Sequence, residues 1–113
     1  VAFGLESAIL DEGLVIDATS HVGEMLERTR ADVGSDKVLF EAADVYSFCS
    51  ASVSRKVMEA ALLNIAYCPY DIFVARAAGS NETIVGYRKL PEGAMQEVQA
   101  LLDQIARAAV GID

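Results

Sequence analysis

The amino-acid sequence predicts an α+β domain in which an antiparallel sheet carries helices on one face. The stretch from Cys68 to Arg76 alternates in side-chain character, and a turn at Gly79–Asn81 leads into a second strand from Thr83 to Lys89. A long amphipathic helix after Pro91 follows, because its apolar residues recur three and four apart: Met95, Val98, Leu102, Ile105 and Ala109. With 113 residues, 53% of them hydrophobic, the chain fits a single domain over 1–113.

The first part of the chain predicts a helix, a short strand and a second helix. Apolar residues at helical spacing predict a helix from Val1 to Glu12, which ends at Gly13. The apolar run Leu14–Ile16 is compatible with a strand. Ser20 is expected to cap the second helix, which covers His21–Arg28.

The middle of the chain predicts a loop, a strand and a third helix. Residues 30–37 have the composition of a loop, while 38–40 fit either a short strand or a helical turn. Alternation over Asp44–Cys49 indicates a strand. Ser50 or Ser52 can cap a helix that runs to about Leu63. The apolar residues expected on its inner face are Val53, Val57, Met58, Ala60 and Ala61.

The charge balance argues against several partners. Nine Lys and Arg against 17 Asp and Glu give a net charge of −8, whereas binding to nucleic acid or to an anionic membrane surface needs clustered cations. No run of about 18 apolar residues suggests insertion into a membrane. We therefore expect neither a nucleic-acid partner nor membrane insertion.

Two cysteines are the first candidates for chemistry. Cys49 lies between a predicted strand and a helix, where helix amides are expected to lower the pKa of its thiol. Cys68 opens the next predicted strand, so the two thiols can lie close on adjacent strands. A redox pair, a persulfide carrier and a reactive thiol are the functional alternatives. Two buried small side chains, or a structural disulfide, are the structural ones.

His21 is the only histidine, so any metal site that needs an imidazole must use it. It is expected in the first turn of its helix, with Met25 one turn later, where the helix dipole favours the neutral ring. One interpretation is ligation of haem iron or another metal, with Met58 or the partner subunit's His21 as a second ligand. The other is a solvated or hydrogen-bonded side chain.

The remaining candidates are less specific. Asp71 lies in an otherwise apolar strand, either paired with Arg88 or placed on an open sheet face. Four tyrosines fall on or near predicted strands, where they line a pocket, with Tyr70 the leading candidate, or pack in the core. They are Tyr46, Tyr67, Tyr70 and Tyr87.

Five segments taken in order resemble the family called domain of unknown function 302 (DUF302). They are Gly13–Leu14, His21–Leu26, Phe48–Ala51, Cys68–Tyr70 and Val85–Arg88. The resemblance covers nearly the whole chain and implies an α+β fold like that of the TATA-binding protein, usually as a dimer. It implies no reaction and no nucleic-acid binding. Members begin with a strand before the first helix, so the resemblance implies that a first strand is missing here. Some members look exported or occur in sulfur-oxidising bacteria.

Three functions remain open at this point. The first is a non-catalytic, homodimeric ligand-binding module, with haem held through His21 as the version easiest to test. The second is a thiol protein that uses Cys49 and Cys68 in redox chemistry or sulfur transfer. The third is an accessory protein that acts through assembly and exposes a large apolar patch.

Overall fold

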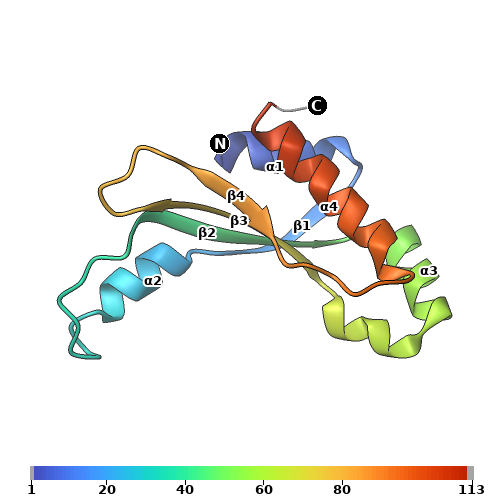
Figure 1. Ribbon diagram of the computed structural model, residues 1–113, viewed down its shortest axis with the longest axis horizontal. Coiled ribbons are helices and arrows are strands. Elements are labelled where there is room, and N and C mark those ends of the chain that lie inside the picture. The colour runs from blue at the N-terminus through green and yellow to red at the C-terminus, as the bar shows by residue number, and fades with distance from the viewer. Residues whose placement is uncertain (1, 112–113) are drawn as a thin grey trace.

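Four antiparallel strands form one sheet in the order β1-β2-β3-β4 in the computed structural model, which describes residues 2–111 (Figure 1). The strands are β1 (Val15–Ser20), β2 (Phe40–Cys49), β3 (Tyr70–Ala77) and β4 (Ile84–Tyr87). The helices are α1 (Ala2–Asp11), α2 (Val22–Thr29), α3 (Ala51–Ala60), the 3₁₀ helix η1 (Leu62–Tyr67) and α4 (Met95–Ala109). The predicted α+β class with an antiparallel sheet is confirmed.

The core lies between one face of the sheet and helices α1 and α4. The alternation in β3 directs Tyr70, Ile72 and Val74 to this face, where each is buried. Phe48 in β2 pairs with Tyr70, and the two rings meet edge to face with 6.5 Å between their centroids. The helices close this core with a set of buried side chains: Leu5, Ile9, Met95, Val98, Leu102 and Ile105.

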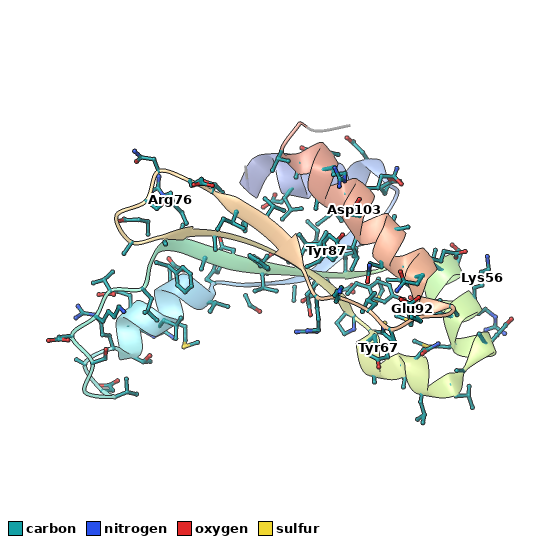
Figure 2. The ribbon with its side chains drawn as sticks, in the orientation of Figure 1. Lys56, Tyr67, Arg76, Tyr87, Glu92 and Asp103 are labelled. Atoms are coloured by element: carbon teal, nitrogen blue, oxygen red, sulfur yellow. The ribbon has the colours of Figure 1, made fainter. Side chains whose placement is uncertain are left out.

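A hydrogen bond joins the last strand to α4. Tyr87 on β4 donates through its hydroxyl to Asp103 of α4 at 2.7 Å (Figure 2). Asp103 also accepts from Arg107, one turn further along the same helix. These two bonds lower the pKa of the Asp103 carboxyl, with the Tyr87 bond as the larger cause.

The other face of the sheet presents a mixed surface. It carries Ser47 and Asp71 beside Phe73, whose ring lies over Gly86 of the neighbouring strand. Phe73 and Ile84 are exposed on this side. Helix α2 lies apart from α1 and α4 and packs against β2, where Gly23 approaches Ala43 (Figure 1). None of the residues of α2 is buried.

Several predicted boundaries were wrong. Ser20 does not cap the second helix, because it is the last residue of β1 and pairs with Val45. The third helix ends at Ala60 rather than Leu63, and a 3₁₀ helix follows. Ala60 and Ala61 are exposed rather than on an inner face, since the chain turns away from the core there. The predicted first helix is present as α1, which ends at Asp11 rather than Glu12, while Val1 lies outside the described residues. Gly13 follows at φ 78°, as expected for a residue that stops a helix.

Helix α4 gives a direct test of where the core lies. Leu102 is 2% exposed, so Leu102→Ala should lower the free energy of unfolding by about 2–5 kcal/mol in a urea titration. Leu63 is 83% exposed on η1, so Leu63→Ala should change it by less than about 0.5 kcal/mol. Equal losses from the two variants would contradict this placement of the core.

Candidate functional site

The pairing of β2 with β3 brings the two cysteines together. Phe48 pairs with Tyr70, so Cys49 at the end of β2 lies level with the residues that lead into β3. Cys68 is the residue at the C-terminal cap of η1. The two sulfur atoms lie 2.8 Å apart, and both side chains are partly buried. The predicted closeness of the thiols is confirmed, although 18 residues separate them in the sequence.

The two thiols have different surroundings. Cys68 packs against the hydrophobic core, whereas Cys49 lines a surface cavity of about 470 Å³. The cavity is formed by the turn after α1, by β1 and by the start of α3. The residues that line it are Glu12, Gly13, Leu14, Val15, Asp17, Cys49, Ser50, Ala51 and Ser52. Cys49 is therefore the sulfur that a molecule in this cavity would meet.

The prediction of a lowered pKa for Cys49 was wrong. Burial, then the hydrogen bond and charge of Cys68, and then the charge of Asp17 raise the pKa of Cys49 from 9.0 to about 12. The opposing influence on this pKa is a backbone hydrogen bond with Tyr70, which is the smallest of the causes. At the start of α3, the amide of Val53 donates to the side chain of Ser50. Cys49 thus keeps its proton at neutral pH.

His21 lies at the start of α2, and the structure corrects its predicted place and charge. It is the N-cap residue rather than a residue of the first turn. Its Nδ1 atom donates to Oδ1 of Asp44 at 2.8 Å, and 59% of its side chain is exposed. The hydrogen bond to Asp44, and then the charge of Asp44, raise the pKa of His21, so the expected neutral ring is not favoured.

A second cavity, of about 700 Å³, lies beside His21 between α2 and β2. Its charged lining holds four carboxylates and one arginine besides the histidine: Glu24, Glu27, Arg28, Glu41 and Asp44. This balance disfavours the two carboxylates of a haem. Among residues 2–111, no group of three or more His, Cys, Asp and Glu side chains is arranged to hold a metal ion.

Of the other proposed ligand residues, only Met25 lies on the helix that His21 caps. Met25 is 40% exposed on α2, where its sulfur meets the hydroxyl of Thr29. Met58 packs against the core from α3. Tyr70 is buried in that core, where its hydroxyl shares a hydrogen bond with Ser54 at 2.8 Å. Within the described chain these four residues therefore form no common site.

Asp71 lies on the open face of the sheet, as one of its two interpretations predicted. Its carboxylate accepts a hydrogen bond from Ser47, and the guanidinium of Arg88 is 4.0 Å away. With Phe73 and Val45 these residues line a hollow of about 360 Å³. The network satisfies Asp71 without burying it.

Sequence reasoning missed two acidic residues that matter here. Asp17 is the extra residue of a β-bulge between Ile16 and Ala18, and a bulge is not visible in an apolar pattern. Asp44 meets His21 because β1 and β2 pair with Ser20 opposite Val45. That register, if known, would have placed His21 opposite Asp44.

The raised pKa of Cys49 predicts how its alkylation depends on pH. Because the thiolate is the reactive form, the rate in the folded, reduced protein should rise about tenfold per pH unit up to about pH 10. In the denatured protein the rate should level off near the ordinary pKa of 9.0. Iodoacetamide labelling read by peptide mass measures both.

A variant separates the causes of this shift. Cys68→Ala removes the neighbouring thiol but leaves the burial of Cys49, so the pKa of Cys49 should fall only part of the way. A rate at Cys49 that levels off below about pH 9 in the folded wild-type protein would contradict the raised pKa.

Comparison with known proteins supports the fold. No family model matches the chain, and no curated protein matches it. The chain is similar to a crystal structure described as an uncharacterized conserved DUF302 protein from Bacillus stearothermophilus, with 20% sequence identity and a TM-score of 0.64. The match covers 97% of this chain and 83% of the other. No helix within residues 2–111 is long and apolar enough to cross a membrane. The chain therefore has the fold of a DUF302 protein, which confirms the resemblance predicted from its sequence at the level of the fold.

Proposed function

We propose that this chain is a thiol–disulfide exchange protein in which Cys49 and Cys68 alternate between a dithiol and a disulfide. The observation that carries the proposal is the 2.8 Å separation of the two sulfur atoms. A disulfide needs the sulfurs at about 2.0 Å, so a small movement of the side chains connects them. Both residues lie at the ends of regular elements, which hold the pair at one place on the fold.

The proposed reaction uses an external thiol as its reductant. A thiolate attacks Cys49 in the oxidised protein and forms a mixed disulfide, while Cys68 leaves with the electron pair and takes up a proton. A second external thiol then loses its proton and attacks the outer sulfur of the mixed disulfide, which releases Cys49 as a thiol after protonation. In sum, two thiols and the protein disulfide become one external disulfide and the protein dithiol.

The surroundings of each sulfur support this order of events. Cys49 faces the cavity and Cys68 faces the core, so an incoming thiolate reaches Cys49 first. Attack on the Cys49 sulfur in the first step does not require Cys49 to ionise. In the second step Cys49 leaves as a thiolate, so its raised pKa slows that step. The raised pKa also slows reoxidation at neutral pH, because there the thiolate of Cys49 must attack an external disulfide.

The haem-binding hypothesis receives less support from the geometry. His21 lies beside four carboxylates, and its suggested partner Met58 packs in the core. Neither feature offers the apolar slot and second ligand that a haem needs. We also propose no nucleic-acid partner, because the net charge of −8 repels phosphate.

Serine variants test the exchange function. The oxidised wild-type protein should contain one intramolecular disulfide, and excess 2-mercaptoethanol should convert it into two free thiols, counted by alkylation and mass. Cys49→Ser and Cys68→Ser should each lose this reversible change, and the thiol left in each can form only mixed or intermolecular disulfides. If the folded wild-type protein never forms the Cys49–Cys68 bond under a mild oxidant, the proposed function is wrong.

We further propose that the chain works as a homodimer that pairs through the open face of the sheet. Phe73 and Ile84 are exposed there beside the partly exposed Val45, and contiguous apolar side chains on a sheet face favour a partner. A second copy of the chain fits this role, as the resemblance to a dimeric family implies.

Light scattering during gel filtration tests the dimer. The wild-type protein should have twice the mass of the chain, and Ile84→Glu should shift the population toward the monomer. Leu63→Glu is the matched control, because Leu63 is exposed on η1 rather than on the sheet. A monomeric wild-type protein, or equal effects of the two variants, would argue against pairing through this face.

A further inference from the structure

We infer that the cavity beside Cys49 favours thiols that carry a positive charge close to the sulfur, such as small aminothiols. The inference rests on the proposed exchange function and names the class of substrate for the same pair of cysteines. It follows from three features: which groups line the cavity, how Asp17 is placed, and how the second carboxylate is held.

The charged groups in the lining are all negative. Of the nine residues that form the cavity, Glu12 and Asp17 are acidic and none is basic. The other residues are small, apolar or hydroxylated, so they do not neutralise these two charges. A thiol that enters the cavity to reach Cys49 therefore meets two carboxylates and no basic side chain.

A bulge in the edge strand places Asp17. Ile16 pairs with Phe48 and Ala18 pairs with Ser47, which leaves Asp17 as an extra residue without a partner in the ladder. Bulges redirect side chains and are frequent beside active sites. The negative charge of Asp17 is close enough to Cys49 to contribute to the raised pKa of that thiol. The same charge acts on any ion that approaches the sulfur.

A contact from another helix holds the second carboxylate. Glu12 follows α1, and its Oε1 atom accepts a hydrogen bond from the side-chain amide of Gln104 in α4 at 2.6 Å. This neutral partner fixes the carboxylate without cancelling its charge. Both acidic groups are therefore positioned at the cavity, and neither forms an ion pair in the described structure.

Attraction between an ammonium group and these carboxylates lowers the barrier for attack on Cys49, and repulsion of a substrate carboxylate raises it. Two unit charges a few ångströms apart at a protein surface interact strongly enough to change a rate by about tenfold. Because the whole chain also carries a charge of −8, the local effect must be separated from general steering.

The experiment measures how fast three thiols reduce the oxidised protein: cysteamine, which is cationic, 2-mercaptoethanol, which is neutral, and 3-mercaptopropionate, which is anionic. Acid quenching, alkylation and mass measurement follow the reaction, and each rate is divided by the thiolate concentration. The selectivity is the rate for cysteamine divided by the rate for 3-mercaptopropionate. We expect it to exceed the selectivity of the same protein in denaturant by about tenfold or more, and to fall as salt is added.

Three variants locate the effect, because each removes one negative charge from the chain. Asp17→Asn and Glu12→Gln should each lower the selectivity severalfold. Asp11→Asn is the matched control, since Asp11 is exposed at the end of α1 and does not line the cavity. It should leave the selectivity close to that of the wild type.

The outcomes distinguish this inference from the function on which it rests. If 2-mercaptoethanol reduces the pair but the folded and denatured proteins have the same selectivity, the inference is wrong and the exchange function stands. Equal effects of Asp11→Asn and Asp17→Asn would also overturn it, because the selectivity would then come from net charge. If none of the three thiols reduces the folded protein, both proposals fail.

Discussion

The antiparallel pairing of β2 with β3 is the constraint on which the rest of the structure depends. Eight residue pairs join the two strands, from Phe40 with Ala77 to Phe48 with Tyr70. One face of this pair buries Phe48, Tyr70 and Ile72, which the helices α1 and α4 then cover. The last pair of the ladder also sets where the chain leaves β2 and where it enters β3. The core and the meeting of the two thiols therefore follow from one register, and a slip of one residue would disturb both.

A disulfide between Cys49 and Cys68 would have a structural effect besides the proposed chemical one. A bond between Cys49 and Cys68 would close the segment that contains α3 and η1, which have few contacts with the sheet among the described elements. Closing a loop of this length removes conformational entropy from the unfolded chain, which raises the free energy of the unfolded state by about 3 kcal/mol. The redox state of the pair would thus change how firmly α3 and η1 are held. Three exposed apolar side chains of η1 lie near Cys68 in the sequence: Leu62, Leu63 and Ile65.

Sequence patterns predicted the features that depend on local order. Alternation placed Tyr70, Ile72 and Val74 on one buried face, and helical spacing placed Val98 and Leu102 on another. The sequence patterns also predicted the hairpin and the closeness of the two thiols, because adjacent strands must bring their ends together. What the sequence could not supply was the set of contacts between distant segments.

Particular residues show why the sequence alone did not predict these contacts. Ser20 has the chemistry of a helix cap, but its place in the ladder with Val45 overrides that preference. Cys49 precedes a helix, yet burial and the neighbouring Cys68 raise the pKa of its thiol. The bulge at Asp17 and the contact between His21 and Asp44 both depend on the register of β1.

An equilibrium redox titration, read by the ¹³Cβ chemical shifts of Cys49 and Cys68, tests most directly the central claim that the two cysteines form one redox pair. In buffers with increasing ratios of oxidised to reduced glutathione, both shifts should move together through one reversible two-electron transition. Two cysteines that titrate separately, or that stay in one state in every buffer, would contradict the account.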